Sequence, residues 1–141
     1  MRLLDTNVIL RFLLNDHPVH SPRAHARLSR PEGCTVTPHI LVEVAVVLEK
    51  VYRLDRTQIV AALRAFIAQE SIEILGLTKP TVDAALLLCQ PSGRVGFADA
   101  FLWAEARQIP GATVLTFDAR FPPEHPDPLW RELGAVAVEA P

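Results

Sequence analysis

The chain has 141 residues, 50% of them hydrophobic and 21% charged, which is the composition of a globular domain that buries a sizeable core. A formal net charge of −2 excludes a protein that holds nucleic acid mainly through a broad basic surface. Cys34 and Cys89 stand far apart, which excludes closely spaced zinc-binding cysteines and favours reduced thiols in the cytoplasm. We expect a single cytoplasmic domain over residues 1–141, because the chain shows no linker, signal peptide or apolar run of membrane-spanning length.

Short apolar segments alternate with amphipathic patterns along the chain, and turn or capping residues separate them. In chain order, these patterns predict a strand at 3–4, a helix at 8–14, a helix from 21–22 to about 30, a strand at 34–36, a helix at 38–52 capped by Thr37, a helix from 56 to about 69 capped by Asp55, a strand at 72–75, a helix opening at 78–80 and ending at 89, a helix at 97–108, a strand at 113–115, a surface loop at 121–129 and a strand at 135–138. Strands separated by helices indicate an α/β fold with a mainly parallel sheet.

Two acidic side chains stand inside apolar helical patterns. Glu43 is the only polar residue of segment 40–48, and Asp99 lies in segment 97–104 with no Lys or Arg three or four residues away. We therefore expect both carboxylates to be substantially buried, where each needs a partner, a proton or a metal ion. A buried ion pair with a residue from another element is the alternative for each of them.

Two further acids follow predicted strands. Asp5 comes directly after the strand at 3–4, and Asp118 comes shortly after the strand at 113–115. The carboxyl ends of parallel strands form the edge at which ligands bind in open α/β sheets. Taken singly, each acid is equally well explained as a turn or helix-capping residue.

Four carboxylates at one strand edge would repel one another unless cations neutralised them. A ligand set made only of oxygen atoms favours Mg²⁺ or Mn²⁺ over zinc. Two such ions, or one ion and a second recruited with the substrate, can activate a water and stabilise the leaving oxygen of a phosphodiester. The pattern therefore predicts a metal-dependent phosphodiesterase whose catalytic and metal-binding residues are Asp5, Glu43, Asp99 and Asp118.

Four segments in this order resemble the motifs of the PIN-domain family, and within it the VapC ribonuclease toxins of bacterial toxin–antitoxin pairs. The segments are residues 4–10, 37–45, 96–100 and 115–121. The resemblance implies a three-layer α/β/α sandwich around a parallel sheet and Mg²⁺- or Mn²⁺-dependent cleavage of RNA. It also implies a homodimer, a separately encoded antitoxin, and transfer RNA or ribosomal RNA as substrate.

The chain departs from the family pattern at one position. Many relatives carry another acid three residues before the third acidic residue, where this chain has Gly96. This departure implies a second metal ion that is held more weakly, or only when RNA is bound.

Other residues beside the motifs are given supporting roles. Hydroxyl or amide groups that would orient the carboxylates or bound water belong to Thr6, Asn7 and Thr116, although Thr6 or Asn7 would serve equally well as a helix cap. Three arginines are predicted to contact RNA phosphates: Arg11, Arg94 and Arg120. The alternative for each of them is a solvated surface charge. The loosely spaced His17, His20 and His25 are interpreted as structural or surface residues.

Three alternatives stay open. Asp5 would be a covalent nucleophile in a phosphoryl-transfer enzyme, but such enzymes usually place a second Asp where this chain has Asn7, and only Lys50 and Lys79 could supply the ammonium partner. A PIN-like interaction module without activity is a non-enzymatic alternative. A third keeps the nuclease and assigns it to RNA processing instead of toxicity.

Overall fold

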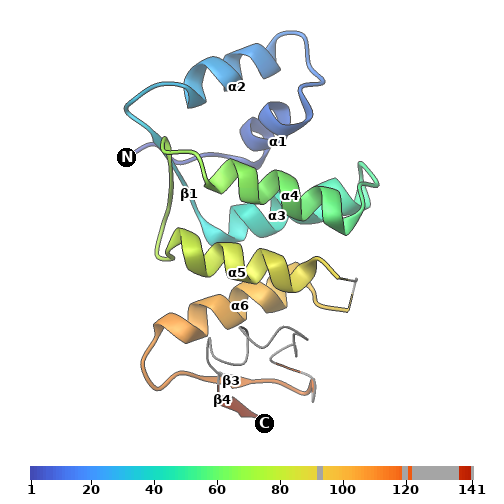
Figure 1. Cartoon of the computed structure of the whole chain (residues 1–141), viewed down its shortest axis with the longest axis vertical. Coiled ribbons are helices and arrows are strands. Elements are labelled where there is room, and N and C mark those ends of the chain that lie inside the picture. Colours follow the sequence, from blue (N-terminus) through green and yellow to red (C-terminus); the bar gives the residue numbers. More distant parts are fainter. Residues whose placement is uncertain (92–93, 119–120, 122–136, 141) are drawn as a thin grey trace.

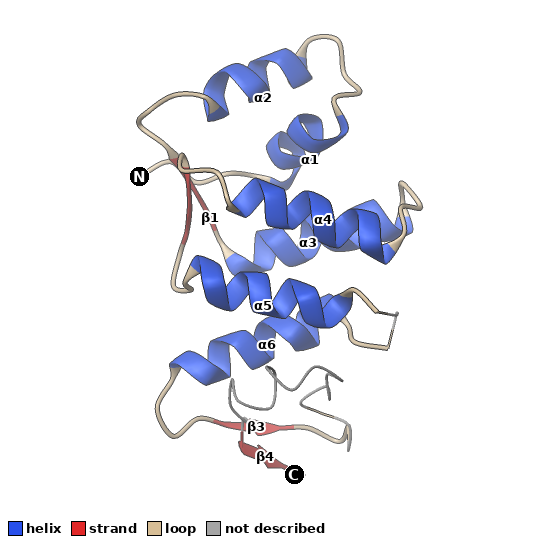
Figure 2. Ribbon diagram, in the orientation of Figure 1, coloured by secondary structure: helices blue, strands red, loops and turns tan. Residues whose placement is uncertain are grey.

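We describe the protein from a computed structural model of the whole chain, and the residues described are 1–91, 94–118, 121 and 137–140. Six helices and four short strands occur among these residues (Figures 1 and 2). In chain order they are α1 (Thr6–Leu14), α2 (His20–Leu28), β1 (Cys34–Val36), α3 (Pro38–Lys50), α4 (Arg56–Ile67), β2 (Ile72–Ile74), α5 (Lys79–Cys89), α6 (Phe97–Gln108), β3 (Thr113–Leu115) and β4 (Ala137–Glu139). No helix of this described part is long and apolar enough to cross a membrane.

Local sequence signals mark the starts of α3, α4 and α5. Asp55 and Gln58 form a capping box at the start of α4, with the Asp55 carboxylate accepting from the Gln58 backbone N–H at 2.8 Å. Thr78 caps α5, where its hydroxyl accepts from the Thr81 backbone N–H at 3.3 Å. Pro38 stands in the first turn of α3, where a missing N–H costs no hydrogen bond. These local signals explain why the predicted starts of α3, α4 and α5 are confirmed.

Some helix boundaries differ from the prediction. α1 begins at Thr6 and not at Val8, because Asp5 is its N-cap. α2 begins at His20, and Ser21 does not cap it, because the Ser21 hydroxyl accepts from the His17 backbone N–H at 3.1 Å and closes the preceding turn. α3 ends two residues before the predicted Tyr52. Arg53 takes a left-handed φ of 57°, which turns the chain out of the helix.

The first strands pair in parallel around β1. The Thr35 backbone N–H donates to the Arg2 carbonyl at 2.8 Å, and the Leu4 N–H donates to the Thr35 carbonyl at 2.9 Å. On its other edge β1 pairs with β2, with Cys34 opposite Ile72. The segment at residues 2–4, β1 and β2 therefore lie side by side in parallel and are joined by helical crossovers, which confirms the predicted α/β class.

A second parallel pair is made by β3 and β4, with Leu115 opposite Glu139. Among the described residues it forms a separate two-stranded sheet, and Figure 1 shows it beyond α6, at the opposite end of the molecule from α1 and α2. β3 joins the core through the buried Val114, whereas Phe117 is 86% exposed. The predicted loop at 121–129 lies outside the described residues except for Phe121, which is buried, and so do residues 135–136 of the last predicted strand.

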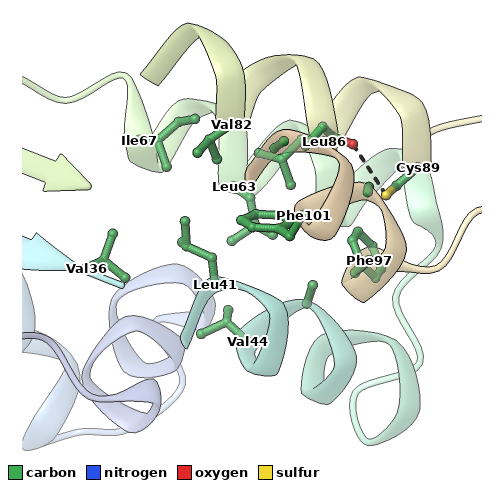
Figure 3. Packing of buried hydrophobic residues seen from close by; sticks show 14 of the residues in the cluster. Val36, Leu41, Val44, Leu63, Ile67, Val82, Leu86, Cys89, Phe97 and Phe101 are labelled. Atoms are coloured by element: carbon green, nitrogen blue, oxygen red, sulfur yellow. Dashed lines mark hydrogen bonds between the residues drawn. The ribbon is translucent and has the colours of Figure 1, made fainter. Parts of the chain in front are cut away.

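The main core lies between α3, α4, α5 and α6 (Figure 3). Leu41 and Val44 project from one face of α3 toward Leu63 of α4 and Phe101 of α6, and all four are at most 3% exposed. α3 also packs against α1. The packing therefore holds α3 between α1 and α6, the helices that carry the first and third acidic motifs.

Candidate active site

Asp5 stands at the junction between the first parallel segment and α1. It is the N-cap of the helix, with φ −89° and ψ 155°, and its carboxylate accepts weakly from the Asn7 backbone N–H at 3.4 Å. A carboxylate oxygen at an N-cap stabilises a helix, because it accepts from a backbone N–H of the first turn that has no partner within the helix. Asp5 is exposed, and it takes the capping role that the sequence left open for Thr6 or Asn7.

Glu43 is held by a hydrogen bond between two helices. The Thr6 hydroxyl on α1 donates to Glu43 Oε2 on α3 at 2.6 Å, and Thr6 itself is only 7% exposed. A charged acceptor makes this one of the stronger side-chain hydrogen bonds. The contact places the second acidic motif beside the first, and it gives Thr6 the carboxylate-orienting geometry proposed from its position in the sequence.

The expected burial of Glu43 is wrong, because its side chain is exposed. α3 buries one stripe of residues at helical spacing, Leu41, Val44 and Leu48, and Glu43 lies on the other side of the helix. Val46 shares that outer side and is 42% exposed. An apolar run along a helix therefore does not show that the helix is covered all round.

Asp99 is exposed as well, and its expected burial is also wrong. It stands in the first turn of α6 after the N-cap Gly96, where an acidic side chain interacts favourably with the helix N-terminus. Leu102, one turn along the helix, is 43% exposed. A β-carbon added at Gly96 would lie 3.2 Å from Asp99 Oδ2. The acid that many relatives carry at this position would therefore stand directly beside the Asp99 carboxylate.

Asp118 lies in the turn that follows β3. Its backbone N–H donates to the Thr116 hydroxyl at 3.0 Å, and the Thr116 N–H donates to the Glu139 carbonyl at 3.0 Å. Thr116 thus shapes the turn at the end of β3 through both groups. β3 lies beyond α6 and belongs to a different two-stranded sheet from β1 (Figure 1).

The oxygen donors suit a hard divalent ion chemically. Over residues 1–91, 94–118, 121 and 137–140, however, no group of three or more His, Cys, Asp or Glu side chains stands close enough to hold a metal ion. The first and second acidic motifs are in contact through the Thr6–Glu43 hydrogen bond, and α6, which carries the third motif, packs against α3, which carries the second. The described carboxylates that would hold such an ion, Asp5, Glu43 and Asp99, are therefore of the right chemical kind but are not assembled into a group of three.

Arg56, which the sequence did not single out, fixes the start of α6. Its guanidinium donates to Glu49 Oε2 at 2.7 Å and to the Cys89 and Val95 carbonyls, and it lies 4.4 Å from the Phe97 ring centroid. Arg56 therefore joins α3, α4 and the end of α5 to the residues just before Gly96. The only sequence signal for this role is a cation beside the Asp55 cap.

The charges of Arg56, Glu49 and Asp99 all act on the thiol of Cys89. Burial raises the pKa of the Cys89 thiol to about 12. The positive charge of Arg56 opposes the rise, whereas the carboxylates of Asp99 and Glu49 add to it. Cys89 also donates to the Ala85 carbonyl at 3.5 Å (Figure 3). The thiol is therefore a neutral core group at physiological pH.

The three arginines proposed to meet RNA differ in their surroundings. Arg11 is engaged, because it donates to Asp16 Oδ1 at 2.8 Å and to the Tyr52 hydroxyl at 2.6 Å. Arg94 is exposed in the turn before α6. Arg120 lies outside the described residues.

Comparison with known proteins identifies the fold family. The family model described as the PIN domain matches residues 2–122, a span that contains all four acidic motifs. No curated protein matches the chain. Because the match covers well over half of the sequence, the chain belongs to the PIN domain family.

Proposed function

We propose that this member of the PIN domain family is a divalent-metal-dependent endoribonuclease that uses Asp5, Glu43, Asp99 and Asp118. Family membership carries the proposal, because PIN domains are generally nucleases. The positions of Asp5 and Asp99 at the N-termini of α1 and α6 support it. So does the hydrogen bond that orients Glu43. A bound Mg²⁺ or Mn²⁺ would supply the activated water that attacks the phosphodiester.

Two isosteric substitutions test the catalytic assignment. Asp5→Asn and Asp99→Asn each remove a negative charge without changing side-chain size, and we expect RNA cleavage in Mg²⁺ or Mn²⁺ to fall at least about a hundredfold. Asp55→Asn is the matched control, because Asp55 is also an exposed helix N-cap but lies on α4. Wild-type rates in both test variants would overturn the assignment.

Gly96 provides a test of the second metal ion. We propose that Gly96→Asp lowers the Mg²⁺ concentration needed for half-maximal cleavage, since the new carboxylate would lie next to Asp99. Gly96→Asn is the control, because Asn caps a helix as well as Asp does but adds no charge. Calorimetric titration with Mg²⁺ measures binding directly. Equal Mg²⁺ dependence of the two variants would contradict a shared ion at this point.

We further propose a biological role as the toxin of a toxin–antitoxin pair, acting in the cytoplasm on transfer RNA or ribosomal RNA. The order and spacing of the four VapC-like segments support this role. Growth arrest on expression, relieved by the product of a neighbouring gene, would be the expected result. Sequencing the 5′ ends of the RNA fragments would identify the substrate. Sedimentation would test the proposed homodimer. If expression caused no growth arrest and one RNA were trimmed accurately, these results would instead favour a role in RNA processing.

A catalytically silent interaction module is a second candidate. The observation that favours it is that no described group of acids is assembled to hold a metal ion. This candidate predicts no heat of Mg²⁺ binding and no cleavage by the wild-type chain. For the covalent alternative, only trapping of a phosphate mimic on Asp5 would support phosphoryl transfer.

A further inference from the structure

A pocket of about 540 Å³ lies between α1 and α2, the two helices that pack together at the N-terminal end of the molecule (Figure 1). His20, Arg23 and Arg27 of α2 recur at helical spacing and share one face of that helix. The other polar lining residues come from α1 and from the turn that connects the two helices. The polar residues around the pocket are Asn7, Arg11, His17, His20, Arg23 and Arg27. The lining thus contains three guanidinium groups and no carboxylate, although the whole chain carries a net charge of −2.

Arg27 presents a cationic donor that lacks an acceptor. Its Nη2 donates to the Gly33 carbonyl at 3.1 Å, which fixes the plane of the guanidinium. Its Nη1 is buried and has no hydrogen-bond partner among the described residues. A buried charged donor without an acceptor is costly. An anionic oxygen in the pocket would supply an acceptor once a small shift of the Arg27 side chain exposed Nη1 to it.

The remaining polar groups are arranged before any ligand arrives. Arg11 is held by Asp16 and by the Tyr52 hydroxyl, so its stem forms a rigid wall. His17 Nδ1 accepts from the backbone N–H of His20 at 3.0 Å, and the two rings stack with centroids 4.2 Å apart. Since Nδ1 of His17 is an acceptor, the proton of its neutral ring is on Nε2, which is therefore a donor. Arg23 is exposed at the rim.

The pocket is adjacent to the first acidic motif. Asn7 lines the pocket, and its backbone N–H donates to the Asp5 carboxylate at 3.4 Å in the first turn of α1. A chain of phosphates that passes Asp5 along this turn would therefore reach the guanidinium groups next. Planar guanidinium forks match the geometry of phosphate oxygens, and the volume suits a nucleotide-sized group.

From this arrangement we infer that the pocket between α1 and α2 binds a backbone phosphate of the RNA substrate, next to the phosphate that is cleaved. The inference rests on the proposed ribonuclease function, and it adds the subsite that holds the flanking nucleotide. Arg23 and Arg27 bind the phosphate directly, while Arg11 and the stacked histidines shape the walls.

The test measures binding separately from cleavage. Fluorescence anisotropy of a short, labelled, mixed-sequence single-stranded RNA is recorded in EDTA, which withholds the divalent ion that the proposed chemistry requires. We expect Arg23→Gln and Arg27→Gln each to raise Kd about tenfold. The slope of log affinity against log salt should become shallower by about 0.7 for each phosphate that a variant no longer neutralises. Arg30→Gln is the matched control, because Arg30 is an exposed arginine just beyond α2 that does not line the pocket.

A second measurement locates the bound phosphate. Neutral methylphosphonate linkages are introduced into the RNA one at a time, and one position should weaken binding to the wild-type chain but not to Arg23→Gln. Equal effects of Arg23→Gln and Arg30→Gln would overturn the subsite. Should Arg27→Gln fail to fold, the exposed Arg23 still decides the matter.

Two other outcomes separate the subsite from its premise. Unchanged RNA binding together with loss of binding to a polyglutamate peptide would overturn the RNA assignment in favour of an acidic protein partner. If Asp5→Asn cleaves RNA at the wild-type rate while Arg23→Gln weakens binding as expected, the proposed catalytic site fails and the phosphate subsite stands.

Discussion

Removal of the Arg56 guanidinium should cost far more stability than removal of a similar arginine on the same helix. The Arg56→Met side chain retains the helix propensity and most of the volume of arginine but leaves three acceptors without their donor. Only 15% of the Arg56 side chain and 23% of the Glu49 side chain are exposed. Breaking a buried ion pair from one side costs about 3–5 kcal/mol, because the partner charge stays buried. Since water can reach part of Glu49, we expect a loss near the lower limit, about 3 kcal/mol.

Arg64→Met is the control. Arg64 binds Asp83 through two hydrogen bonds, at 2.6 and 3.2 Å, but 43% of its side chain is exposed. Exposed pairs contribute about 1 kcal/mol or less, because solvent screens them. Urea denaturation of both variants gives the two losses, and for Arg56→Met the melting temperature should fall by roughly 10 °C.

A double substitution examines the cause of the loss. Glu49→Met combined with Arg56→Met removes both charges, so part of the stability lost in Arg56→Met should return. Equal losses in Arg56→Met and Arg64→Met, or a further loss in the double variant, would refute the reasoning. RNA cleavage by Arg56→Met at a temperature where it is folded would report how far this side chain positions Asp99.

Three further predictions concern single groups. Thr6→Val removes the donor to Glu43 and should reduce the unfolding free energy by about 1.5 kcal/mol in urea denaturation, whereas Thr6→Ser should keep most of it. The Cys89 pKa is raised from 9.0 to about 12, so above pH 9 the unfolded state releases this proton and the folded state retains it. Stability should therefore fall between pH 9 and 12, and fall less in Cys89→Ala. Gly33→Ala should cost about 2 kcal/mol, because φ is +64° and the added carbon would lie 3.0 Å from the carbonyl that precedes β2. Gly111→Ala, with φ +76° and open space around it, should cost about half as much in the same assay.

Much of the fold follows from local sequence. Residues 97–108 and 113–115 form the predicted helix and strand without any shift in their bounds. The Asp55 cap works as predicted, because its side chain bonds to a backbone N–H only three residues away. Such bonds need no information about the rest of the molecule. Thr37 occupies the predicted N-cap position of α3, but its side chain makes no capping hydrogen bond.

The sequence pattern did not predict that the side chains of Glu43 and Asp99 are exposed. Glu43 and Asp99 stand in apolar runs, yet both lie on outer faces beside the exposed side chains of Val46 and Leu102. Which side of an apolar helix is covered depends on its neighbours, and these come from distant segments. The Arg56 network was missed for the same reason, since its acceptors are 7 to 39 residues away in the chain.

The four carboxylates proposed as the site stand out in the sequence, Glu43 and Asp99 by their apolar helical surroundings and Asp5 and Asp118 by their positions after predicted strands, and the family match spans all four. Only the tertiary structure shows that Thr6 binds Glu43 and that β3 lies beyond α6. It also shows that the arginines of α2 at positions 23 and 27 line one pocket. The arginine spacing of α2 shows which residues share a face of that helix, but what the face meets is decided by the packing of α1. Local hydrogen bonds and hydrophobic periodicity are properties of neighbouring residues, whereas a binding site depends on long-range packing.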